Sequence, residues 1–209
     1  RLKANRDIVK EAIRYCDGVP FRYASKDLRG DRQFLLSLMR IESCCINYAD
    51  ESLRTDKEFM LQVVNAGHGF WAASNELKRS QSFILQAISS DALSIKDADP
   101  TIQSDRELCL MAVSMNGNVL QYMGEDLKHD KEVVTRAVCN SGNALQFASE
   151  TLRDDETVVS RAVSSFWPSI QYASERLRAN LAIGIHAVSK SHHAIYFLHD
   201  SLKENPEIM

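Results

Sequence analysis

The feature that most constrains the fold is a repeat of about 25 residues that runs through the whole chain. A leucine or isoleucine begins each unit, at intervals of 24 to 26 residues. These leading residues are Leu2, Leu28, Leu53, Leu77, Ile102, Leu127, Leu152, Leu177 and Leu202. They define eight full units and the opening of a ninth within 209 residues. Self-similarity at such a period is typical of solenoids, in which each unit packs only against its neighbours.

The first half of each unit predicts an amphipathic helix. The fourth position, counting the leading residue as the first, always holds a residue type that caps a helix start. The capping residues are Asn5, Asp31, Asp56, Ser80, Asp105, Asp130, Asp155, Asn180 and Asn205. Apolar residues follow at the seventh, eighth, eleventh and twelfth positions, which form one face of a 3.6-residue helix. Gly117 and Gly142 come where this helix should end, and we expect them to form left-handed C-caps.

The second half of each unit predicts a shorter helix that reaches the leading residue of the next unit. Ala144, Leu145, Ala148 and Leu152 show its apolar spacing. Neither helix buries its apolar face alone, so we expect successive helix pairs to share one core. The predicted fold class is therefore all-α, an α-solenoid of about eight tandem 25-residue two-helix repeats. We expect residues 1–209 to form a single repeat domain, a fragment of a longer protein because Arg1 replaces an initiator methionine and the ninth unit is incomplete.

Residues 130–152 resemble the repeats of domain-of-unknown-function family 4116. The matching residues are Asp130, Glu132, Val133, Val134, Ala137, Val138, Gly142, Ala144, Leu145, Phe147, Ala148, Ser149 and Leu152. Residues 155–177 match well and 105–127 in part, whereas the resemblance weakens between about 28 and 101. Such repeats occur in secreted effectors of intracellular bacteria and in single-celled eukaryotes. The resemblance implies an interaction scaffold or effector, and it implies no catalytic residue or cofactor.

Composition and motifs narrow the function further. The formal net charge of −3 argues against a dedicated nucleic-acid binder, and no apolar stretch is long enough for a membrane span. Five cysteines without a Cys-x-x-Cys motif indicate reduced thiols and a cytoplasmic location, or the host cytosol for an effector. No nucleotide-binding, metalloprotease or hydrolase motif occurs. We therefore expect no enzyme activity, no cofactor and no metal site.

A row of leucines is the first candidate interaction surface. The ninth position of four consecutive units holds Leu36, Leu61, Leu85 and Leu110, where other units have Lys10, Thr135 or Ser160. Stacked repeats would align these leucines, and contiguous exposed apolar surface marks contact sites. The alternative is a thicker core in these units, because Phe34, Phe59 and Phe83 lie two positions earlier.

Aromatic residues supply the second set of candidates. The unit that begins at Leu53 is one residue short, which places Trp71 at the outward-facing site that is the twentieth position in other units. It either anchors an interface or fills the gap left by Ala72 in the next position. That next position is otherwise mostly aromatic, as at Tyr122 and Tyr172, and either packs adjacent repeats or offers stacking platforms. Tyr196, beside Phe197 in this row, completes the candidate interaction residues.

Three functions fit these observations. The first is a non-catalytic scaffold for an unidentified protein partner. The second is a single-stranded RNA-binding array, favoured by the regular tyrosines and opposed by nearby acids such as Glu125, Glu150 and Glu175. The third is an accessory domain of an enzyme whose catalytic domain lies outside these residues.

Overall fold

The computed structural model describes residues 2–15, 18–67 and 69–208, and these residues form short helices joined by tight turns. No strand occurs among them, so the all-α repeat fold is confirmed. The chain divides into two compact units, residues 1–99 and 100–209. The repeat period of the sequence continues through residue 100, so both units contain the same kind of repeat. The single domain over 1–209 stays a prediction.

Each regular repeat contains three helical segments where the sequence analysis expected two. In the repeat that begins at Leu127, these are the ten-residue α10 (Lys131–Asn140), the 3₁₀ helix η8 (Gly142–Phe147) and the one-turn α11 (Glu150–Arg153). The expected second helix is divided because Ala148 and Ser149 are extended, with ψ angles of 155° and 157°. The two-helix detail was therefore wrong, although the period and the first helix were right.

The other elements follow this pattern in both units. The first unit contains η1 (Leu2–Ala4), α1 (Arg6–Ile13), η2 (Val19–Tyr23), α2 (Lys26–Arg29), α3 (Arg32–Met39), η3 (Ser43–Tyr48), α4 (Glu51–Arg54), α5 (Lys57–Asn65), η4 (Phe70–Ala72), η5 (Leu77–Arg79), α6 (Gln81–Ser90) and η6 (Ala92–Asp97). The second adds α7 (Pro100–Gln103), α8 (Arg106–Met115), η7 (Gly117–Tyr122), α9 (Glu125–Lys128), α12 (Glu156–Ser165), η9 (Trp167–Tyr172), α13 (Glu175–Arg178), α14 (Leu181–Lys190), η10 (His192–Phe197) and α15 (Asp200–Lys203).

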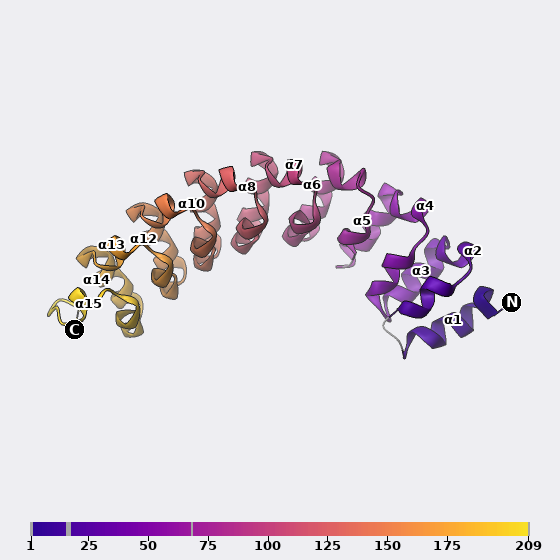
Figure 1. Cartoon of the computed structure of the whole chain (residues 1–209), viewed down its shortest axis with the longest axis horizontal. Coiled ribbons are helices and arrows are strands. Elements are labelled where there is room, and N and C mark those ends of the chain that lie inside the picture. Colours follow the sequence, from indigo (N-terminus) through magenta and orange to yellow (C-terminus); the bar gives the residue numbers. More distant parts are fainter. Residues whose placement is uncertain (1, 16–17, 68, 209) are drawn as a thin grey trace. The chain divides into compact units, whose positions relative to one another are not determined.

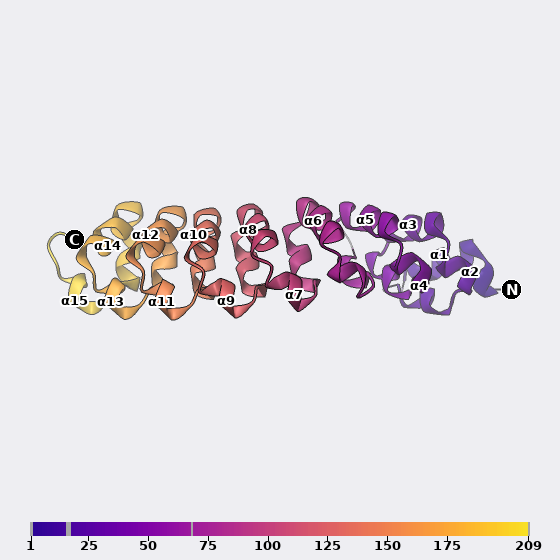
Figure 2. The same cartoon turned by 90° about the horizontal axis from the view of Figure 1, so that it is seen from above.

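Equivalent elements stack in layers within a unit. In the second unit, the long helices α8, α10, α12 and α14 lie side by side, and the 3₁₀ helices η7 to η10 form a second layer (Figure 1). The one-turn helices α9, α11, α13 and α15 line one edge of that unit (Figure 2). Long helices and 3₁₀ helices therefore present two different surfaces to solvent.

A backbone hydrogen bond joins successive short helices and explains the extended residues between them. The N–H of Ser149 donates to the carbonyl of Lys128 at 3.0 Å, and the N–H of Ser174 donates to Arg153 at 2.9 Å. The same bond recurs at Ser25–Lys3, Asp50–Arg29, Ser74–Arg54, Asp99–Lys78, Gly124–Gln103 and His199–Arg178. Because a continuous second helix would use these amides internally, the break in the helix allows each repeat to bond to its predecessor.

The predicted caps and core are confirmed with one exception. Seven of the expected residues accept backbone amides at the start of a long helix, and Asn205 caps a turn. Ser80 is the exception, because its hydroxyl pairs with that of Ser82 instead. The four apolar positions of α10, Val133, Val134, Ala137 and Val138, are all fully buried.

Gly117 and Gly142 have a different role from the one expected. Neither adopts a positive φ, so they are not left-handed C-caps. A Cβ added to Gly117 would lie 2.1 Å from the carbonyl oxygen of Ala137, and one on Gly142 would lie 2.5 Å from that of Ala162. These glycines are therefore needed because the long helix of the next repeat passes directly against them.

Candidate groove between α3 and α5

The predicted leucine row is only partly exposed. Leu36 and Leu61 are half-buried and Leu85 is 41% exposed, all in the first unit. Leu110, in the second unit, is buried at 9% exposure. Phe34, Phe59 and Phe83 are buried beneath the row, as the thicker-core alternative requires. Apolar surface at this position is therefore accessible on α3, α5 and α6, and also on α14, where Ile185 is 38% exposed.

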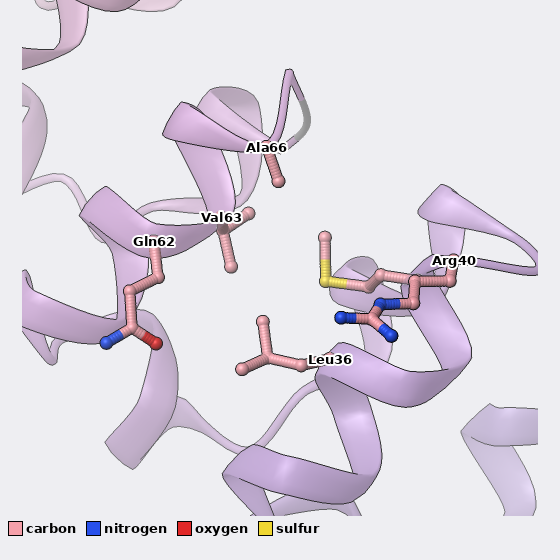
Figure 3. A pocket seen from close by; sticks show the side chains of 6 residues that line it. Leu36, Arg40, Gln62, Val63 and Ala66 are labelled. Atoms are coloured by element: carbon pink, nitrogen blue, oxygen red, sulfur yellow. The ribbon is translucent and has the colours of Figure 1, made fainter.

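Leu36 lies in a groove between α3 and α5 that the sequence did not reveal. The groove has a volume of about 260 Å³ and is lined by Leu36, Met39, Arg40, Gln62, Val63 and Ala66. Figure 3 shows Leu36 of α3 and its C-cap residue Arg40 facing Val63 of α5 and its C-cap residue Ala66 across this space. The groove is therefore mostly apolar, with one guanidinium and one side-chain amide at its walls.

The groove lies where two successive long helices of the first unit, α3 and α5, have few close backbone contacts. Their backbones approach each other less closely than those of α5 and α6 in the same unit. These helices are also short, with eight residues in α3 and nine in α5, against ten in α8, α10, α12 and α14. No residue pattern in the sequence marks this spacing, so Met39, Arg40, Gln62, Val63 and Ala66 were missed as candidates.

Trp71 lies at the surface of the first unit rather than in the gap beside Ala72. Its side chain is 43% exposed, whereas Ala72 is buried. The indole Nε1–H donates to Oδ1 of Asn47 at 2.8 Å, which ties η4 to η3 in the preceding repeat. The structure thus places Trp71 outward, as an interface anchor requires, but away from the residues that line the groove.

The aromatic row is half-buried at most of its positions, whereas Tyr23 is 60% exposed. Tyr122 and Tyr172 are half-buried in the second unit, as a flanking position predicts. Tyr196 differs, with 73% exposure, and its ring lies 6.3 Å from that of His193. His193 is also 6.5 Å from Trp167, which lies 6.1 Å from Phe197. The exposed aromatic surface of this unit is therefore gathered on η9 and η10.

Acidic side chains lie near the aromatic row. Glu125, Glu150 and Glu175 are exposed at the starts of α9, α11 and α13, a few residues after the half-buried rings. Lys128 pairs with Glu125 at 2.7 Å, and this contact lowers the pKa of Glu125 from its ordinary value. Arg153 lies 3.8 Å from Glu150, and His199 lies 3.5 Å from Glu175, so acidic and basic side chains are paired along this edge.

Two of the described cysteines have buried thiols. Burial raises the pKa of Cys45 and of Cys109 to about 12, so both thiols are protonated at neutral pH. Cys139 is exposed on α10, and Cys44 is half-buried. Cys16, which was expected to be reduced with the others, lies outside the described residues.

Among residues 2–15, 18–67 and 69–208, no three His, Cys, Asp or Glu side chains are grouped closely enough to hold a metal ion. In the same part of the chain, no helix combines the length and the apolar character needed to cross a bilayer.

A polar hollow in the second unit has a side chain with a structural role in its wall. It is lined by residues of three successive repeats, including Asn118, Asn140 and Phe166. The Asn140 side chain donates to the carbonyl of Ser114 at 3.0 Å and accepts the Gly117 amide at 2.8 Å. Asn140 thereby caps the end of α8 from the neighbouring repeat, which is a structural role that the sequence analysis missed.

Comparison with known proteins identifies the repeat. The family described as "Domain of unknown function (DUF4116)" matches residues 31–78, 80–128 and 130–178. The match extends through residues 31–101, where the resemblance was expected to weaken. No curated protein and no solved structure matches the chain. Because the three matched segments cover well over half of the sequence, this chain belongs to the DUF4116 family.

Proposed function

We propose that this chain is a non-catalytic scaffold that binds a partner protein in the groove between α3 and α5. The observation that carries the proposal is the groove itself, because it places the half-buried Leu36 and the exposed Ala66 beside two polar groups, above the buried Met39 and Val63. Interfaces obtain most of their binding energy where an anchor side chain fills such a pocket. The DUF4116 repeats provide the rigid stack that holds its two walls.

The size of the groove favours a protein segment over a cofactor or small metabolite. Pockets for small molecules usually enclose about 300–1,000 Å³ and surround most of the ligand. The groove, at about 260 Å³, is smaller and opens between two helices. One or two side chains of a partner would fill it, while the rest of the partner would lie on the helix surface.

The proposal includes the absence of catalysis in this chain. The groove offers a guanidinium, an amide and apolar side chains, but no acid, base or nucleophile lines it. We extend the proposal to a role in a secreted bacterial effector that acts in the reducing host cytosol. The family resemblance and the free thiols of Cys45, Cys109 and Cys139 support that extension.

Selection from a displayed library of random peptides tests the proposal. The whole chain is immobilised, and the enriched peptides are synthesised and titrated by fluorescence anisotropy. Ala66→Trp should fill the groove and weaken binding at least tenfold. Gln86→Trp is the control, because it adds the same side chain to an exposed position on α6 outside the groove. Circular dichroism checks that both variants remain helical.

The outcomes separate the competing functions. Peptides that bind Ala66→Trp as tightly as the wild type would remove the groove as the docking site. Tight binding of a random oligonucleotide pool that weakens steeply with salt would favour the RNA-binding alternative instead.

A further inference from the structure

Arg40 distinguishes the groove from an ordinary apolar hollow. It is the C-cap residue of α3, exposed to solvent, and one of the groove's lining residues. Figure 3 shows its guanidinium directed into the space between the helices, close to Leu36. A permanent positive charge therefore faces an apolar wall formed by Val63 and Ala66.

The other arginines of α1 and α3 are already engaged. Arg6 pairs with Asp31, and Arg32 pairs with Asp56 in the next repeat. Arg14 pairs with Glu11 at 3.1 Å. Within the described part of the chain, the Arg40 side chain makes no hydrogen bond or ion pair. Arg40 is thus available to a ligand in a way that its counterparts are not.

The charge of the groove wall selects among partners. Its six lining residues include one cation and no acid. A guanidinium forms two parallel hydrogen bonds with a carboxylate, and neighbouring apolar atoms reduce the screening of that pair by water. On the opposite wall, the Gln62 amide has both a donor and an acceptor for a peptide backbone.

We propose that the groove recognises a segment of a partner protein in which an Asp or Glu lies beside an aliphatic or aromatic side chain. The apolar side chain enters between Leu36 and Ala66, and the carboxylate bonds to the Arg40 guanidinium. This inference rests on the proposed function, since it names the partner of the same groove.

Charge reversal at Arg40 tests the inference. Peptides selected from the random library on the wild-type chain should share an acidic residue next to an apolar one. Arg40→Gln should weaken their binding about tenfold. Arg40→Glu should weaken it further, and should instead prefer the same peptide with its acid changed to lysine. Arg14→Glu is the matched control, because Arg14 is the C-cap of α1 and does not line the groove.

Each result bears on one claim. If Ala66→Trp abolishes binding but Arg40→Glu leaves the preference for acidic peptides unchanged, the groove stands and the carboxylate inference falls. If neither variant affects binding, the proposed function falls as well. Enriched peptides without an acidic residue would also overturn the inference. Thermal melts of the Arg40 variants exclude loss of folding, which is not expected for an exposed side chain.

Discussion

Lys131 donates from Nζ to Oδ2 of Asp155 at 2.6 Å, while Oδ1 of the same aspartate accepts the amides of Thr157 and Val158. One carboxylate thus caps its own helix and holds the first residue of the preceding long helix. The arrangement recurs as Arg6–Asp31, Arg32–Asp56 and Arg106–Asp130. The capping aspartate is therefore also a link between successive repeats.

Substitution of Asp130 should separate its two roles. Asp130→Ala removes the cap of α10 and the pair with Arg106, and should lower the free energy of unfolding by about 1 kcal/mol from the cap alone. Asp130→Asn keeps an oxygen that accepts the helix amides, so its loss should be smaller. Urea denaturation followed by circular dichroism measures both. Equal losses in the two variants would contradict the division of roles.

The same pair predicts a dependence on pH. The hydrogen bond from Arg106 is the largest effect that lowers the pKa of Asp130 below its ordinary value of 3.8. A lowered pKa in the folded state stabilises the fold above the ordinary value, and this contribution disappears as the pH falls through the folded-state pKa. The thermal unfolding midpoint should therefore decrease as the pH is lowered below about 4. Arg106→Gln should show a shallower fall, and an identical profile would exclude the pair as a cause.

The sequence predicted the long helices because their information is local. A capping residue such as Asp130 and apolar residues such as Val133 and Val138 lie within one helix, so their spacing defines its start and its buried face. The division of the second helix was missed, although Ser149 and Ser174 are residue types that begin helices. Its cause is non-local, since their amides bond to the preceding repeat.

The groove could not be predicted from the sequence for a similar reason. Leu36 was identified as unusual, but the groove depends on the distance between α3 and α5, and Arg40 matters because of what it does not contact. For Gly142, a local sequence rule predicted a helix C-cap, whereas the residue allows close packing against the backbone of the next repeat.

Ser169 should be replaceable with a gain in stability. Its hydroxyl is fully buried and has no hydrogen-bond partner, whereas the neighbouring repeats have Ala144 and Ala194 at the same position. Ser169→Ala should raise the free energy of unfolding by about 1 kcal/mol. The variant lacks the hydroxyl that, in the wild type, gives up its hydrogen bonds to water on folding and gains none in return. Ser94→Ala is the control, since the Ser94 hydroxyl donates to Ala87 at 3.5 Å. A loss of stability in Ser169→Ala would contradict the assignment.

Gly142→Ala should be among the more damaging changes in the second unit. The added methyl group would meet the carbonyl of Ala162 at 2.5 Å and the amide of Phe166 at 2.9 Å, and neither backbone atom yields easily. We expect a loss of about 2 kcal/mol, typical of overpacking. Gly30→Ala is the matched control, because its nearest neighbour would be 3.5 Å away. Similar stability of the two variants would show that the repeats separate to accommodate the methyl group.

The two tryptophans allow each compact unit to report its own unfolding. Trp71 lies in the first unit and Trp167 in the second, and the chain contains no others. Trp167→Phe leaves Trp71 as the reporter of the first unit, and Trp71→Phe leaves Trp167 as the reporter of the second.

Repeat proteins are stabilised by contacts between neighbouring repeats, so regular and irregular regions differ in stability. The first unit has the shorter helices and the groove, whereas the second has ten-residue helices throughout its stack. We therefore expect the Trp71 signal to change at a lower urea concentration than the Trp167 signal. Coincident transitions would instead favour one cooperative domain over residues 1–209.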